Sequence, residues 1–162
     1  MIGSRDVHEA VATAWDSADL DDLFTAYWGG DDSDDFLVLN DQEAAPEQPF
    51  PYCIFNQEEP IVVNRMSGTL SARREVRDII WEFRVYAKTV DSTAAKDVAG
   101  ALAEEIMKVF GGHPTETPSA LSLDTGQHLI TQYLTDYGMR LGDSEHYWLV
   151  RYLFRVDVPV AQ

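Results

Sequence analysis

A strand joined by a short turn to an amphipathic helix, at residues 77–112, constrains the fold of this chain more than any other feature. In the segment RDIIWEFRVYAK, the apolar Trp81 and Phe83 alternate with the charged Glu82 and Arg84. Alternation with a period of two is typical of a strand that buries one face and exposes the other. The segment therefore predicts a sheet with one covered face.

The helix follows in the segment DSTAAKDVAGALAEEIMKVFGG. We expect it to begin at Asp91 or Ser92, which can cap a helix, and to end at Gly111, a residue suited to the left-handed conformation after a helix. Its apolar residues recur at the spacing of one helical face. The residues predicted to pack on the sheet are Ala95, Val98, Ala99, Leu102, Ile106 and Val109.

The remaining elements complete an α+β pattern. Helices are predicted at the N-terminus and at residues 20–28, and strands at 36–39, 52–56, 61–66, 129–134 and 147–158. We expect a hairpin-like connection at QEEP between the strands at 52–56 and 61–66. The last strand is predicted to pair with the strand that contains Trp81 or with the one at 129–134. Residues 1–162 thus predict one domain, an antiparallel sheet of four to six strands with the helix at 94–110 on one face.

Acidic residues are concentrated in the first part of the chain. The net charge is −16, from 28 acidic and 12 basic residues. Residues 1–60 hold 15 acidic side chains and only Arg5, which gives −14, so the other 13 acidic and 11 basic side chains give −2. Nucleic-acid-binding proteins neutralise phosphates with Lys and Arg, so DNA is not expected as the primary ligand. Within the acidic part, residues 31–51 predict a surface loop with DDSDD and three prolines.

No arrangement of residues is typical of a catalytic, cofactor or metal site. The four histidines lack the spacings of zinc ligands, and DDSDD does not fit a calcium-binding EF-hand loop, because Phe36 stands where glycine is needed. Cys53 has apolar neighbours and is expected to be a buried core thiol. The sequence has neither a run of about 18 apolar residues nor the pattern of a signal peptide. We therefore expect a soluble cytoplasmic protein without enzymatic activity, cofactor or metal ion.

Four arginines form the main basic feature: Arg65, Arg73, Arg74 and Arg77 lie on or beside a polar arm at residues 67–77. Such an arm suits a head-to-tail contact with the acidic surface of a neighbouring copy. The hypothesis is that these arginines form a subunit interface. The alternative is that they pair with acidic residues of their own subunit or remain solvated.

Three segments carry a resemblance to a known family. They are the strand entry PYCIF, the strand WEFRVYAK that leads into the helix STAAKDVAGALAEEIMKVF, and the closing strand WLVRYLFRVDV. In this order they resemble the minor tail or tail-terminator (tail-completion) proteins of long-tailed bacteriophages and prophages. The resemblance extends over residues 7–158 and is one of fold pattern.

The resemblance implies a virion structural protein of the tail or neck, assembled in the host cytoplasm. Its subunits would form a ring, a hexamer in the simplest case, that caps the tail tube and binds the head-tail connector protein. One alternative is a head-tail connector or neck protein, which would also form a ring. The other is a small-molecule-binding or enzymatic domain with a pocket built from Trp81, Tyr86, Trp148 and Tyr152.

The charge asymmetry leads to a first prediction. Changing Arg73, Arg74 and Arg77 to Glu should weaken self-association without unfolding the subunit, because the arm would then repel an acidic neighbour. Sedimentation velocity measures the association, and circular dichroism checks the folding. Unchanged association of a folded triple variant would contradict this interface.

Overall fold

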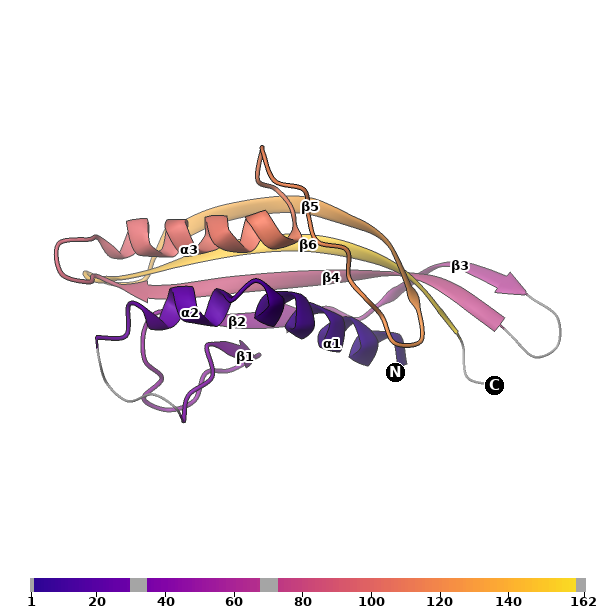
Figure 1. Cartoon of the computed structure of the whole chain (residues 1–162), viewed down its shortest axis with the longest axis horizontal. Coiled ribbons are helices and arrows are strands. Elements are labelled where there is room, and N and C mark those ends of the chain that lie inside the picture. Colours follow the sequence, from indigo (N-terminus) through magenta and orange to yellow (C-terminus); the bar gives the residue numbers. More distant parts are fainter. Residues whose placement is uncertain (1, 30–34, 68–72, 160–162) are drawn as a thin grey trace.

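Three helices lie on one face of a six-stranded sheet in the computed structural model, which describes residues 2–29, 35–67 and 73–159 (Figure 1). The helices are α1 (Ile2–Ser17), α2 (Leu20–Thr25) and α3 (Ala95–Phe110). The strands are β1 (Leu39–Asp41), β2 (Tyr52–Gln57), β3 (Ile61–Ser67), β4 (Arg73–Lys88), β5 (Gln127–Arg140) and β6 (Glu145–Pro159). The predicted α+β class is confirmed.

The long antiparallel pair of β4 and β6 is the centre of the sheet. The pair extends from Arg74 opposite Pro159 to Lys88 opposite Glu145. The strand order is β1-β2-β4-β6-β5, and β3 also pairs with β4. The last strand therefore pairs with both of its predicted partners. One edge differs from the prediction, because β1 is parallel to β2 and makes the sheet mixed.

The predicted hairpin between the strands at 52–56 and 61–66 is wrong. Both β2 and β3 pair with β4, β2 along residues 81–86 and β3 along residues 73–78. The chain therefore continues along the same edge of β4 instead of reversing. The backbone N–H of Glu58 still donates to the carbonyl of Ile80, at 2.9 Å. Pro60 has no N–H to donate, which explains the break between the two strands.

The predicted basic arm at 67–77 is also largely a strand. β3 extends to Ser67 and β4 begins at Arg73, so the two form a hairpin that projects beyond the helices (Figure 1). Charged residues are accommodated in this part of β4 because they pair with opposite charges across the sheet. Arg74, for example, contacts Asp157 of β6.

Other boundaries shift for local reasons. The short strand β1 lies at 39–41 instead of 36–39, and β5 is more than twice as long as predicted. The helix α3 begins at Ala95 because Asp91, with φ of 51°, lies in a turn where Val90 and Thr93 bond to each other. Its predicted end is confirmed, since Gly111 follows with φ of 126°, a value suited to glycine.

The core lies between the helices and the covered face of the sheet. Phe83 of β4 is fully buried, with its ring centroid 4.9 Å from Phe110 of α3 and 5.8 Å from Trp15 of α1. All six residues predicted to form the buried face of α3 are buried. Cys53 is fully buried as predicted, and this burial raises the pKa of its thiol well above the ordinary value.

A core substitution tests this packing. Phe83→Ala should lower the free energy of unfolding by about 3–5 kcal/mol, because it removes a ring between two helices and leaves a cavity. Urea denaturation followed by tryptophan fluorescence measures the change. The control is Leu37→Ala, at a side chain that is 71% exposed, which should change the free energy by less than about 0.5 kcal/mol. Equal effects of the two substitutions would contradict the packing.

Candidate functional site: the uncovered face and open edges of the sheet

The face of the sheet opposite the helices carries charged residues in pairs. The guanidinium of Arg155 donates from Nε and Nη2 to the two carboxylate oxygens of Asp78, at 2.7 and 2.9 Å. Further pairs are Arg74 with Asp157, Lys88 with Glu145, Arg84 with Glu82, and Arg151 with Glu58 and Glu82. These pairs join five basic and five acidic side chains. The charges on this face therefore offset one another, although the chain as a whole carries −16.

A row of aromatic rings crosses the same face near one end of the sheet. Ring centroids are 5.0 Å apart between Phe50 and Tyr52, 5.2 Å between Tyr52 and Tyr86, and 5.7 Å between Tyr86 and Tyr147. Partial burial raises the pKa of the Tyr52 hydroxyl, with a smaller contribution from Tyr86. Sequence reasoning missed this row, because it depends on the register of three strands.

The strand β5 has an open edge. It pairs with β6 on one side and, in the described part of the chain, with no strand on the other. Two bulges, next to Ile130 and next to Thr135, interrupt its register with β6. Large apolar side chains are exposed along it: Leu129, Ile130, Tyr133, Leu134, Tyr137 and Met139. An exposed apolar edge of this length favours pairing with another strand.

Charged residues do little to block this edge. The carboxylate of Asp136 is turned to its own subunit, where it accepts hydrogen bonds from the hydroxyl of Tyr133 and from Nε1 of Trp148, the latter at 2.8 Å. β5 contains no lysine or proline, the residues that often protect open edges, and its arginine is the last residue, Arg140. The edge is therefore chemically suited to a protein contact.

A second open edge lies on the opposite side of the sheet. Among the described strands, β3 pairs with β4 alone, and its first residues, Ile61, Val62 and Val63, are exposed. The edges formed by β3 and β5 thus both carry exposed apolar side chains.

The four arginines of the predicted interface come together in the β3–β4 hairpin. In the backbone register, Arg65 lies opposite Glu75, and Arg73 lies opposite Ser67. Of these four, side chains are described for Arg74 and Arg77. Nε of Arg74 lies 3.0 Å from Asp157, and Nη2 of Arg77 lies 2.9 Å from Glu75. These two arginines therefore pair within their own subunit, and their role in an interface stays a prediction.

The aromatic residues of the alternative pocket are not gathered in one place. Trp81 and Tyr152 are fully buried in the core, where the hydroxyl of Tyr152 donates to the carbonyl of Gly111 at 2.6 Å. Tyr86 lies on the uncovered face, in the row with Tyr52 and Tyr147. The pocket proposed from these residues is therefore wrong.

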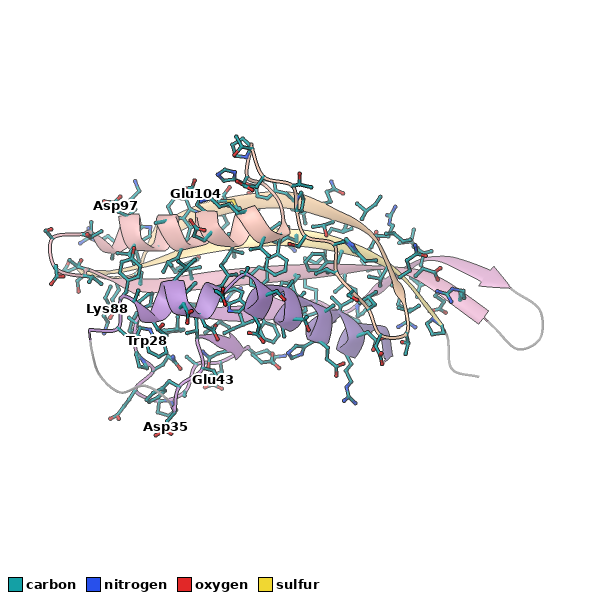
Figure 2. The ribbon with its side chains drawn as sticks, viewed as in Figure 1. Trp28, Asp35, Glu43, Lys88, Asp97 and Glu104 are labelled. Atoms are coloured by element: carbon teal, nitrogen blue, oxygen red, sulfur yellow. The ribbon has the colours of Figure 1, made fainter. Side chains whose placement is uncertain are left out.

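Ionisable residues outside the sheet face are scattered. Among the described residues, no group of three or more His, Cys, Asp or Glu side chains could hold a metal ion, and most of the DDSDD segment lies outside them. Figure 2 shows acidic residues spread over different elements, with Asp97 and Glu104 on α3 and Glu43 after β1. The ring of His113 contacts Glu104 at 3.2 Å, on the surface. No described helix is long and apolar enough to cross a membrane.

Comparison with known proteins does not place this chain in a family. No protein-family model matches the sequence, and no curated protein matches it. Among solved structures, the chain is similar to one from the virion of a native gene transfer agent particle. The two share 18% identity over 74% of this chain and 78% of the other, with a TM-score of 0.43. Similarity this low carries no argument about fold or function.

Two histidines, one in β5 and one in β6, lead to a pH prediction. Burial lowers the pKa of His128 and of His146, and the charge of Lys96 lowers that of His146 further. The unfolded chain then binds protons more readily than the folded one below about pH 6.5, so the free energy of unfolding should fall as the pH decreases through that range.

Titration of the histidine ring signals by NMR measures this effect. Lys96→Ala should raise the pKa of His146, because it removes a nearby positive charge. Lys108→Ala removes a charge of the same sign from the other end of α3, where Lys108 pairs with Glu105, and should leave His146 unchanged. A pKa of His146 above 6.5 in the unmodified chain would contradict the geometry around this ring.

Proposed function

We propose that this chain is a structural subunit of a phage or phage-like virion, of the tail-terminator kind. In this role, copies form a ring that caps the tail tube and joins it to the head. The partners are other copies of the chain, the tail tube protein and a head-tail connector protein. The subunit acts in the tail or neck of the particle and assembles in the host cytoplasm.

One observation carries the proposal: a sheet with helices on one face exposes the other face and two apolar edges. Exposed apolar strands with few charges promote aggregation of a monomeric protein, because they can pair with strands of other chains. They are useful in a subunit that must be covered by neighbours. The order of elements that resembles tail-terminator proteins agrees with such a role.

A non-enzymatic role is part of the proposal. The described charged residues of the uncovered face are engaged in ion pairs, and the thiol of Cys53 is fully buried in the core. A nucleophile or general base needs a group that can reach a substrate. A role in protein assembly uses the exposed residues that the chain does have.

The second candidate is a head-tail connector or neck protein. The same open edges favour it, because a connector ring also needs subunits that bind side by side. The two roles differ in the partner: a terminator binds the end of the tail tube, and a connector binds the portal side of the head.

Assembly and partner binding test the proposal together. Light scattering coupled to size exclusion, over a range of concentrations and salt, followed by negative-stain electron microscopy, should show closed rings, with six copies expected. The rings should bind the ends of purified tail tubes in pull-down and imaging. Rings that bind only head particles would favour the connector role. A chain that forms no ring, alone or with tail tubes, would contradict both.

A further inference from the structure

We propose that copies of this chain associate head to tail by strand pairing, with the first half of β5 in one copy adding to β3 of the next. The inference rests on the proposed function and deepens it, because it assigns the surface that joins neighbouring subunits. The occupant of each open edge is a second copy of the same chain.

The register of the sheet places the two edges at the same level. Ile61 of β3 lies opposite Asp78, Asp78 opposite Arg155, and Arg155 opposite Ile130 of β5. One row thus crosses four strands and ends in an isoleucine on each side. Ile61 is 62% exposed and Ile130 is 52% exposed. Repeating the subunit sideways along this row places Ile130 of one copy beside Ile61 of the next.

Strand direction fits the same arrangement. β3 is antiparallel to β4, β4 to β6, and β6 to β5. β5 therefore runs in the direction of β4, and β3 in the opposite direction. When two copies have the same orientation, β5 of one and β3 of the other meet as an antiparallel pair. All helices then stay on one side of a continuous sheet, and the repeat closes into a ring where the rotation permits.

Side chains at the junction are complementary in size and polarity. Leu129 and Ile130 on one edge would lie against Ile61 and Val62 on the other, and all four are exposed in the single subunit. Cross-strand apolar pairs of this kind stabilise sheets. The pairing covers both apolar edges at once, whereas a two-fold contact of β5 with β5 leaves β3 exposed.

Charge also favours the head-to-tail contact. Residues 61–77, which include the hairpin, hold four arginines and one glutamate, so 4 − 1 gives a net +3 within a chain of −16. Asp124, in the segment that leads into β5, lines a groove together with Asp6 and Glu9 of α1. Pairing of β3 with β5 brings the basic hairpin of one copy next to this acidic groove of its neighbour, which steers the two edges together.

Disulfide trapping tests the pairing directly. In a Cys53→Ala background, one sample carries Ile61→Cys and a second, differently tagged sample carries Ile130→Cys. After mild oxidation, the mixture should form the 61–130 cross-link at a rate at least about tenfold above that of Leu37→Cys mixed with Ile130→Cys, because assembly raises the effective concentration. The double variant Ile61→Cys/Ile130→Cys should give a ladder of covalent oligomers.

Two results would overturn the pairing. Rapid cross-linking of Ile130→Cys with itself would show a two-fold contact of β5 with β5. Equal cross-linking rates for the 61–130 pair and for the Leu37 control would show that these edges do not meet. This holds whether the sample is monomeric or assembled.

Substitution by lysine gives an independent measurement. Ile130→Lys and Ile61→Lys should each weaken self-association by about tenfold or more, since a charge on an open strand blocks edge pairing. Leu37→Lys is the matched control, because Leu37 is also an exposed apolar residue but lies outside β3 and β5, and it should leave the association unchanged. An equal loss in all three variants would contradict the proposal.

Different results would contradict the strand pairing and the virion role. Rings seen by electron microscopy without the 61–130 cross-link would overturn the pairing and leave the virion role standing. A 61–130 cross-link in a protein that forms open chains and binds no tail tube would support the pairing and contradict the virion role.

Discussion

The antiparallel ladder between β4 and β6 is the constraint on which the rest of this structure depends. Its covered side carries the aromatic core, in which Phe83 and Tyr152 contact the helices, and its other side carries the ion pair of Asp78 with Arg155. β2 and β3 add to the free edge of β4, and β5 adds to the free edge of β6. Because β2, β3 and β5 pair directly with this ladder, it fixes which residues lie along the two exposed apolar edges.

The two faces of the sheet have different roles. The covered side buries large rings and supplies the stability of the subunit. The uncovered side keeps its charges in pairs, so it presents little net charge to a neighbour of the same sequence. Repulsion between copies of a strongly acidic chain is lowest where the surface is neutral. The open edges β3 and β5 border this neutral face, so the net charge of the chain does little to oppose the strand pairing that we propose.

Much of the covered side could be predicted from the sequence, because residues that bury one face repeat with the period of their element. The alternation in β4 and β6 and the helical spacing in α3 are of this kind. The pairing of β3 with β4 could not be predicted, since a short apolar strand has the same local pattern whichever partner it takes. The length of β5 was missed because apolar residues are exposed along it and no alternation marks it. The contact of Arg74 with Asp157 also depends on strand register between residues far apart in sequence.

Hydrogen–deuterium exchange of backbone amides, measured by mass spectrometry at low and at high protein concentration, tests the central claim most directly. The account predicts that amides of β5 and β3 exchange rapidly in the dilute subunit and become protected together in the assembled one, while the amides of α3 and of the β4–β6 ladder are protected in both. Protection that appears on α1 and α2 upon assembly, with β5 and β3 unchanged, would contradict the claim that the open edges of the sheet join the subunits.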